Sequence, residues 1–360
     1  MKIDIWVIIY AIVFGGNLLA ALIFTPLARK RSLATGFMDT PKSEAHKQQS
    51  SAVALGGGYA MMLALMSCIL LGMAGYLLHL PEKLGIAESL NFNPFQIKYL
   101  SLLFAAFAAT LLGFIDDRHA LSAPIKFGGQ FLVALIAVWP GEARLSLFIP
   151  SPLIVTVISI FWFMLLMNAI NFFDNMDGLA TGTIAIAMGF FLFTAALNQQ
   201  FLVAVMAAAV MGCSIGFWWY NKAPAKIYMG DSGSHLLGFL AALVSVCVTY
   251  FRPDSASYFP IFMPLLILAL PLTDAATVCV IRAKMGKPFW IGDHNHISHR
   301  FVKMGLSRPQ AVLCVHLLSI IFGLAALPLL WSGLRTTVVI LLQGAVLITF
   351  ILYIQHEAKK

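Results

Sequence analysis

Charged residues are scarce in this chain. Only 11% of its 360 residues are Asp, Glu, Lys or Arg, whereas 60% are hydrophobic. Soluble globular domains carry about a quarter charged residues, so this composition excludes an ordinary soluble domain. Apolar runs of about 20 residues recur along the chain, and each is long enough to cross the ~30 Å hydrocarbon core of a bilayer. The sequence therefore predicts an integral membrane protein.

Cysteine is also rare, and its spacing excludes two kinds of structure. All five cysteines fall inside apolar runs, and no two of them form a Cys-x-x-Cys pair. This distribution fits neither a disulfide framework nor a cysteine-based metal site. We expect these cysteines to be buried small hydrophobic side chains.

The net charge of +8 is distributed as membrane topology requires. Of the 23 Lys and Arg residues, 17 fall in segments that we place on one side of the membrane. These are residues 28–51, 116–126, 171–179, 221–234 and 282–309, together with the C-terminus. The positive-inside rule makes that side cytoplasmic, with the N-terminus outside and the C-terminus inside. This pattern explains the basic charge without a nucleic-acid partner.

Hydropathy predicts an all-α polytopic membrane protein with about 10–11 transmembrane helices. No linker, repeat or low-complexity stretch divides residues 1–360, so we expect a single domain. The predicted spans are residues 5–27, 53–80, 98–115, 126–140, 150–168, 180–197, 201–220, 235–251, 258–281, 310–331 and 336–354.

The third apolar run ends in LLGFIDDRHA, which places Asp116 and Asp117 together at the membrane surface. Adjacent carboxylates repel each other, so such a pair usually needs a cation or a shared proton. The alternative is a plain stop signal for the helix in the headgroup region.

The next predicted cytoplasmic segment reads NAINFFDNMDGLATG. Asn168, Asn171, Asp174 and Asp177 recur in it at three-residue spacing and would share one face of a helix end. Carboxylates and amides grouped in this way can hold a hydrated Mg²⁺ ion or bind the polar edges of a nucleotide. A turn also uses Asn, Asp and Gly, but it needs fewer of them.

The segment NKAPAKIYMGDSGSHLLG places Asp231 between glycines, just before a predicted helix that Ser232 or Ser234 would cap. Backbone N–H groups there can meet phosphate oxygens while the carboxylate binds a metal ion. Lys222 and Lys226 would supply positive charge to a diphosphate. A capped helix start without a ligand is the alternative.

Asp274 lies inside an apolar run, ILALPLTDAATVCVIRAK. Intramembrane carboxylates are costly and usually functional. We expect Asp274 to face the interior of the bundle, where it supports the site or pairs with a cation.

The longest basic loop contains GKPFWIGDHNHISHRF, in which three histidines and two charged residues fall within eight positions. No cysteine lies nearby and the other motifs are rich in carboxylates, so zinc is disfavoured. Imidazoles and the Arg300 guanidinium suit phosphate contacts or the stabilisation of transition-state charge. Some of the histidines could instead serve only packing or capping.

The order of these motifs resembles that of the polyprenyl-phosphate N-acetylhexosamine-1-phosphate transferases, glycosyltransferase family 4. The resemblance runs from Asp39 to about Ser307. Four blocks carry it: the aspartate pair, NAINFFDNMDGLA, MGDSGS and the histidine loop ending in HISHR. Members of this family include undecaprenyl-phosphate N-acetylglucosamine-1-phosphate transferase and phospho-N-acetylmuramoyl-pentapeptide transferase.

The resemblance implies a reaction at the cytoplasmic face of the bacterial inner membrane, in a multi-pass protein. A UDP-N-acetylhexosamine gives its sugar 1-phosphate to a polyprenyl (undecaprenyl) phosphate and releases UMP, which initiates a lipid-linked envelope glycan. The implied cofactor is Mg²⁺, with Mn²⁺ as an alternative. The partners are the nucleotide sugar and membrane lipid, and a homodimer is compatible with the sequence. The histidine loop favours N-acetylglucosamine as the sugar over N-acetylmuramoyl-pentapeptide.

The same resemblance assigns roles to individual residues. Asp231 matches the Mg²⁺ ligand. Asp116 and Asp117 match the pair that acts on the lipid phosphate, as a base or as a second metal contact. We expect Asp117 to be the second metal contact. Asn171, Asp174 and Asp177 match positions that line the nucleotide pocket.

The histidine loop and the first loop depart from the family pattern. His296 and His299 match the outer histidines of an HxHH pattern, and we expect both to be catalytic. The middle histidine of that pattern is Ser298 here. In the first loop the usual Arg-Lys of the family is missing, and His46 lies one residue earlier than the matching histidine of the family. With that shift, the resemblance implies that His46 and Lys47 bind substrate.

Two readings from other functional classes compete with a transferase. An intramembrane Asp274 would suit a secondary transporter, but the polar motifs cluster at one surface and no internal repeat is present. A non-catalytic, lipid-binding scaffold would tolerate loss of the aspartates. Substitution of the aspartates and a test for turnover separate these readings.

Overall fold

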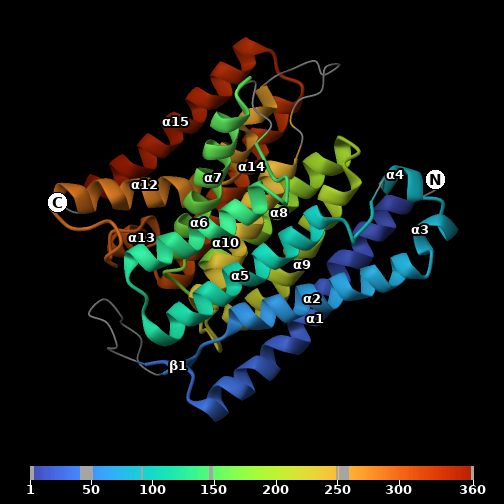
Figure 1. Ribbon diagram of the computed structural model, residues 1–360. Helices are drawn as coiled ribbons and strands as arrows, with labels where there is room; N and C mark the ends of the chain where they lie inside the picture. Colours follow the sequence, from blue (N-terminus) through green and yellow to red (C-terminus); the bar gives the residue numbers. More distant parts are fainter. Residues whose placement is uncertain are drawn as a thin grey trace.

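The computed structural model describes residues 4–40, 52–90, 92–145, 149–248, 250 and 259–357. Within these ranges the chain is almost entirely helical (Figure 1). The strands there are two short ones, β1 (Met38–Asp39) and β2 (Val53–Ala54), which pair antiparallel. The predicted all-α fold class is confirmed.

Nine helices of the described chain are long and apolar enough to cross a membrane. They are α1 (Ile5–Thr35), α2 (Gly57–Leu77), α5 (Ile97–His119), α7 (Pro152–Phe173), α8 (Leu179–Leu197), α9 (Phe201–Asn221), α10 (Gly230–Cys247), α14 (Arg308–Ala326) with η2 (Leu327–Leu330), and α15 (Leu334–Glu357). This count fits the predicted multi-pass membrane protein.

The remaining helices are broken or short. A tenth crossing is present if η1 (Phe259–Phe262) and α11 (Met263–Ile267) form one span with α12 (Ala269–Lys284), from which they are separated by a bend of 68°. In Figure 1, α12 crosses the direction of its neighbours and ends near α13 and the C-terminus. The others are α3 (Leu80–Lys83), α4 (Ala87–Leu90), the 16-residue apolar α6 (Ala123–Val138), α12 (Ala269–Lys284) and α13 (Ile297–Lys303).

Several helices extend into segments that the sequence predicted as loops. Helix α1 continues to Thr35, and α5 continues past the aspartate pair to His119. Helix α10 begins at Gly230, so its first turn already contains Asp231. The predicted serine cap of α10 is therefore wrong: Met229 is its N-cap, and the Ser232 hydroxyl donates to the Met229 carbonyl at 3.1 Å from within the helix.

Helix α10 lies at the centre of the bundle, with nearly all of its side chains buried. Glycines on two neighbouring helices allow close approach to its first turn. A Cβ atom added at Gly113 of α5 would lie 2.2 Å from the Asp231 carbonyl oxygen, and one at Gly58 of α2 would lie 2.2 Å from the Gly233 nitrogen. Both positions need glycine, because a real Cβ cannot approach so closely. This packing places three helix ends around Asp231.

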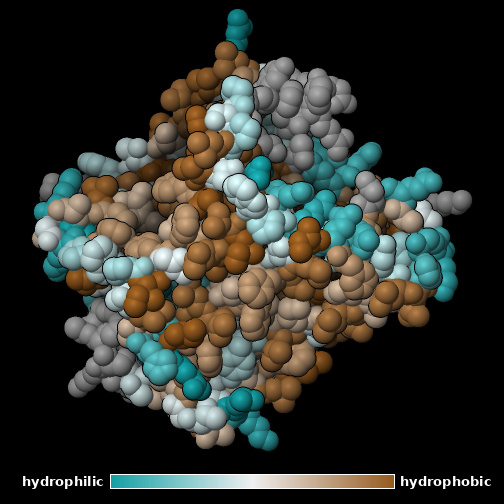
Figure 2. Space-filling model, in the orientation of Figure 1, coloured by the Kyte–Doolittle hydropathy of each residue, from teal (hydrophilic) through white to brown (hydrophobic). Residues whose placement is uncertain are grey.

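The outer surface is strongly apolar. Figure 2 shows hydrophobic side chains over most of the middle of one face, with hydrophilic residues gathered towards its edges. Many large hydrophobic side chains on α1, α2, α14 and α15 are exposed. An exposed apolar surface of this extent would be unstable in water, whereas lipid accommodates it.

Candidate active site

A partly buried lysine joins two of the predicted aspartates. The Lys126 ammonium, in the first turn of α6, lies 2.7 Å from a carboxylate oxygen of Asp116 and 2.7 Å from one of Asp231. The other Asp231 oxygen accepts a 2.7 Å hydrogen bond from the Asn171 amide on α7. Asp231 is thus the point at which α5, α6, α7 and α10 meet. The sequence motifs did not single out Lys126. The sequence analysis used it only as one of the positive charges that define the cytoplasmic side.

The two adjacent aspartates have different partners. The Asp117 carboxylate accepts hydrogen bonds from the backbone N–H groups of Asp231 (2.7 Å) and Ser232 (3.0 Å). It therefore satisfies free N–H groups at the start of α10, where an anion is favoured. Asp116 instead holds Lys126 and accepts from the Leu121 N–H at 2.7 Å. One member of the pair anchors a helix and the other anchors a cation.

A hydrogen-bonded series of amide and imidazole groups connects Asp231 to helices α6 and α7. The His235 Nδ1–H donates to the Asp231 carbonyl at 2.7 Å, so His235 Nε2 is left to accept a 2.9 Å hydrogen bond from the Gln130 amide. The Gln130 side-chain oxygen in turn accepts from the Asn168 amide at 2.6 Å. Gln130 lies one helical turn after Lys126 on α6, so this network fixes the rotation of the helix that presents the lysine.

Asp174 and Asp177 follow the end of α7. Burial, together with the negative charges of Asp231, Asp177 and Asp117, raises the pKa of Asp174 to about 8. The Asp177 carboxylate accepts a 2.9 Å hydrogen bond from the Ala225 N–H, which ties it to the segment between α9 and α10. We call Asp116, Asp117, Asp174, Asp177 and Asp231 the carboxylate site.

Lys222 and Lys226 lie near this segment but form no ion pair with the carboxylate site within the described structure. The Lys222 ammonium lies 3.6 Å from the ring centroid of Trp219, in a cation–π contact. Lys226 has an exposed side chain, and its carbonyl accepts a 3.0 Å hydrogen bond from Arg29. The proposed contact of both lysines with a diphosphate stays a prediction.

Asp274 faces the interior of the bundle, as expected, and is fully buried. One of its carboxylate oxygens lies 2.7 Å from His296 Nδ1, and the other accepts a 2.6 Å hydrogen bond from the Ile297 N–H. A carboxylate only accepts, so Nδ1 carries the proton and Nε2 is the free ring nitrogen. Gln355, near the end of α15, donates to the Ile297 carbonyl at 3.1 Å. We call α13, with its N-cap His296, the histidine helix.

Ser298, which replaces the middle histidine of the family pattern, joins the two parts of the site. Its hydroxyl donates to the Asn175 side-chain oxygen at 2.5 Å, and the Asn175 amide donates to the Phe172 carbonyl at 3.0 Å. The sequence patterns did not single out Asn175. Ser298 therefore connects the histidine helix to the turn that carries Asp174.

Of the remaining groups of the histidine loop, Arg300 is buried and the two histidines are half-buried. The rings of His294 and His299 make an edge contact with centroids 5.0 Å apart. Burial, and then the neighbouring His296 and His294, lower the pKa of His299 to about 3, so its ring is neutral at pH 7. The Arg300 guanidinium is 6% exposed, and its Nη2 lacks a partner in the described part of the chain. The predicted residues His46 and Lys47 lie outside the described residues.

The donor set of the carboxylate site suits Mg²⁺, which prefers hard oxygen ligands. Of the two carboxylates that pair with Lys126, Asp231 is the more accessible: 32% of its side chain is exposed, compared with 8% of the Asp116 side chain. In the described ranges, no three acidic, histidine or cysteine side chains form a ready-made metal cluster. The assignment of Asp231 and Asp117 as ligands of such an ion, with water or substrate completing its coordination, stays a prediction.

The chain is similar to several known proteins. Residues 99–249 match the family described as Glycosyl transferase family 4. A probable undecaprenyl-phosphate N-acetylglucosaminyl 1-phosphate transferase of Bacillus subtilis is 28% identical over 88% of this chain and 84% of its own length. A decaprenyl-phosphate N-acetylglucosaminephosphotransferase of Mycobacterium leprae is 31% identical over 69% of each chain. A phospho-N-acetylmuramoyl-pentapeptide-transferase of Bacillus licheniformis is 30% identical over 67% of this chain and 75% of its own.

Proposed function

Because this chain belongs to glycosyl transferase family 4 and is a multi-pass protein of the bacterial inner membrane, we propose that it moves a sugar phosphate onto a lipid. The donor is UDP-N-acetylglucosamine and the acceptor is a polyprenyl phosphate. The product is a polyprenyl-diphosphate-linked sugar, and UMP is released. The named relatives from Bacillus subtilis and Mycobacterium leprae support this donor.

The charge of the carboxylate site is the observation that carries the proposal. Five carboxylates gather where α5 and α7 end and α10 begins, and Lys126 pairs with two of them, Asp116 and Asp231, in the described structure. Both substrates are polyanions, so this site would repel them without added positive charge. A bound Mg²⁺ would neutralise the diphosphate and stabilise the departing UMP.

The chain's own residues then have distinct tasks. Lys126 is placed to face the phosphate that approaches Asp116 and Asp231. Asp117 keeps the first turn of α10 in register, which aims the Asp231 carboxylate. The acceptor phosphate is already ionised near neutral pH, so Asp116 needs only to accept a residual proton or to orient the acceptor.

The histidine helix would supply the complementary positive or polar contacts. His296, oriented by Asp274, directs its free Nε2 away from that carboxylate. Arg300 has an unpartnered N–H group that suits a phosphate or carbonyl oxygen. By the resemblance described above, Asn171, Asp174 and Asp177 would line the nucleotide pocket.

A phospho-N-acetylmuramoyl-pentapeptide transferase is the second candidate. The Bacillus licheniformis relative with that name supports it. The two candidates differ in the donor sugar and share every other group described above. The histidine loop, which lacks three consecutive histidines, favours the N-acetylglucosamine donor.

The proposal is tested with detergent-purified protein, undecaprenyl phosphate and a panel of UDP-N-acetylhexosamines. We expect a lipid-linked product carrying one phosphate and sugar from UDP-N-acetylglucosamine. Product formed only from UDP-N-acetylmuramoyl-pentapeptide would establish the second candidate. No lipid product from any donor would refute the transferase function and favour a transporter or scaffold.

A further inference from the structure

The inward face of α15 ends in a buried glutamine. Along this helix the buried positions are separated by three, four, seven and four residues, so they form one stripe that faces the bundle: Thr337, Ile340, Gly344, Ile351 and Gln355. Gln355, the last of them, is 1% exposed and lies in the final turn of the helix. An amide is costly to bury without a partner, so its place in this stripe depends on what it contacts.

Gln355 bonds to the residue that follows His296. Its Nε2 group donates to the Ile297 carbonyl at 3.1 Å, across 58 residues of sequence. The Ile297 N–H donates to Asp274 at 2.6 Å, and the Ile297 side chain is 1% exposed. The peptide groups on both sides of Ile297 are therefore held by side chains from two other helices, α12 and α15.

These two contacts together fix the direction of His296. Asp274 binds both the His296 ring and the Ile297 N–H, so it aligns the ring with the start of the histidine helix. That helix has seven residues and no side-chain cap of its own, and Asp274 alone would leave it free to tilt about this end. Gln355 bonds to the other side of the same residue and removes this freedom.

From these contacts we propose that Gln355 is a positioning residue for the reaction, which makes the C-terminal end of α15 part of the active site. Gln355 acts through Ile297 and needs no contact of its own with the substrate. Its task is to hold His296 Nε2 in place, so the inference rests on the function proposed above, in which His296 contacts the substrate. A displacement of about 1 Å can lower a rate about 100-fold, so one hydrogen bond at this position is enough to affect turnover.

A role in stability alone accounts less well for this glutamine. Its Oε1 atom is buried and has no hydrogen-bond partner in the part of the chain that the structure describes. The side chain therefore gains one hydrogen bond but leaves an acceptor unpaired, and the net contribution of such a group to stability is small. An apolar side chain would continue the stripe at least as well. What the amide adds is the bond to Ile297.

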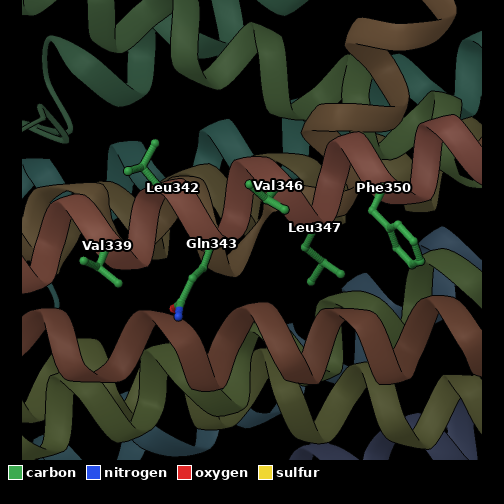
Figure 3. Close-up of a pocket in the computed structure, with 6 residues that line it drawn as sticks. All are labelled: Val339, Leu342, Gln343, Val346, Leu347 and Phe350. Carbon is green, nitrogen blue, oxygen red and sulfur yellow. The ribbon is translucent and has the colours of Figure 1, made fainter.

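Hydrogen exchange tests the contact without any substrate. Gln355→Met keeps the volume of the side chain and removes the bond to Ile297, so peptides covering residues 296–304 of the purified full-length protein should exchange about fivefold faster. Gln343→Met is the matched control, because Gln343 is exposed on the same helix and lines the pocket shown in Figure 3. The control should exchange as wild type does. Equal exchange in Gln355→Met and wild type would overturn the proposal.

The effect on the reaction is measured as kcat and KM for UDP-N-acetylglucosamine. Gln355→Met should lower kcat about tenfold with little change in KM, while Gln343→Met retains the wild-type values. In a His296→Gln background, Gln355→Met should change kcat less than about twofold, because its effect passes through His296. Losses that multiply in the double variant would show a role separate from His296 and would overturn the proposal.

The positioning role and the proposed function fail in different ways. A wild-type protein that forms no lipid-linked product refutes the proposed function, whereas hydrogen exchange still measures the contact with Ile297. Full turnover by a folded Gln355→Met refutes the positioning role alone. If Gln355→Met does not fold, Gln355→Asn, whose amide is one carbon shorter, gives the same comparisons.

Discussion

The carboxylate site and the histidine helix are built in contrasting ways. The carboxylates lie at the ends of long helices, and their positions follow from main-chain packing at Gly58 and Gly113. The histidine helix has seven residues, too few to be stable alone. Side chains from distant segments hold it: Asp274, Gln355 and Asn175. Substitutions in the carboxylate site should therefore alter the charge at the reacting groups. Substitutions in the side chains that hold the histidine helix should instead displace His296 and its neighbours.

The two regions also carry ionisable groups with opposite pKa shifts. Burial among other carboxylates raises the pKa of Asp174 to about 8, and burial beside other histidines lowers the pKa of His299 to about 3. Both shifts favour the neutral form of the group. The carboxylate site thus gains from an added cation, while the histidine helix gains from an added anion. By our proposal, a diphosphate bound together with Mg²⁺ would supply both.

The largest effect is expected at Asp231. Asp231→Asn retains the size of the side chain but removes the charge that holds Lys126 and, by our proposal, the metal ion. Turnover should fall at least about 10²–10³-fold, measured as UMP release, while the thermal unfolding of the variant shows a folded protein. Near-normal turnover at saturating Mg²⁺ would remove Asp231 from the reaction.

The second effect concerns Lys126, which was not expected from the motifs. Lys126→Met leaves Asp116 and Asp231 unpaired, so we expect turnover to fall about 10–100-fold and stability to fall by about 2–3 kcal/mol after allowance for partial exposure. Lys126→Arg keeps the charge and should retain most of the stability. Equal melting temperatures for Lys126→Met and Lys126→Arg in the absence of divalent ions would mean that the ion pairs of Lys126 do not stabilise the fold.

Asp274 tests the positional role of the histidine helix. Asp274→Asn still offers an acceptor to the Ile297 N–H but weakens the orientation of His296. We expect kcat to fall about 10–100-fold, as for other supporting residues, with little change in KM for the UDP-sugar. Thr273→Val, one residue away and without a side-chain bond in the described structure, is the control. A rise in KM with constant kcat would assign Asp274 to binding.

Asp174 gives a smaller, pH-dependent effect. Its pKa is about 8 in the folded protein and near 3.9 in an unfolded chain, so between these values the folded state binds more protons. Without divalent ions, the free energy of unfolding should therefore fall as pH rises from 5 to 8, by up to about 1 kcal/mol per unit from this group. Asp174→Asn should flatten that dependence in thermal unfolding with a chelator present. An unchanged slope would mean that Asp174 is ionised in the folded state.

His299 should show the opposite sign and the smallest effect. Its folded pKa of about 3 lies below the usual value near 6.5, so the unfolded state binds more protons between these values. Stability should fall as pH drops below 6.5, by less than about 1 kcal/mol per unit because the ring is partly exposed. His299→Gln should reduce this loss between pH 7 and pH 5. An identical loss in the variant would contradict the neutral state of His299.

The sequence predicted the spans and the carboxylates well, because hydropathy and clustered acidic residues are local signals. It did not predict the groups that connect them. Lys126 and Gln130 lie in an apolar helix at ordinary spacing, and apart from Asp116 their partners lie 38 to 105 residues away. Gln355 is one of several polar residues at the end of α15, and nothing in the sequence distinguishes it from them. Such contacts depend on which helices become neighbours, and no local pattern encodes that.

The serine cap of α10 was predicted wrongly for a related reason. Ser232 and Ser234 follow Asp231 in a pattern typical of a helix start, yet the helix already begins at Gly230. Asp117, from another helix, satisfies the free N–H groups instead. A cap supplied by a distant side chain cannot be read from the residues beside the helix.

The central claim is that the carboxylate site carries out phosphate transfer with a bound cation. The most direct measurement is UMP release from UDP-N-acetylglucosamine by the purified wild-type protein, with undecaprenyl phosphate present or absent and Mg²⁺ present or removed by a chelator. The account predicts release only when lipid and Mg²⁺ are both present. Lipid-dependent release at the same rate in the chelator would contradict the role given to the cation and to Asp231.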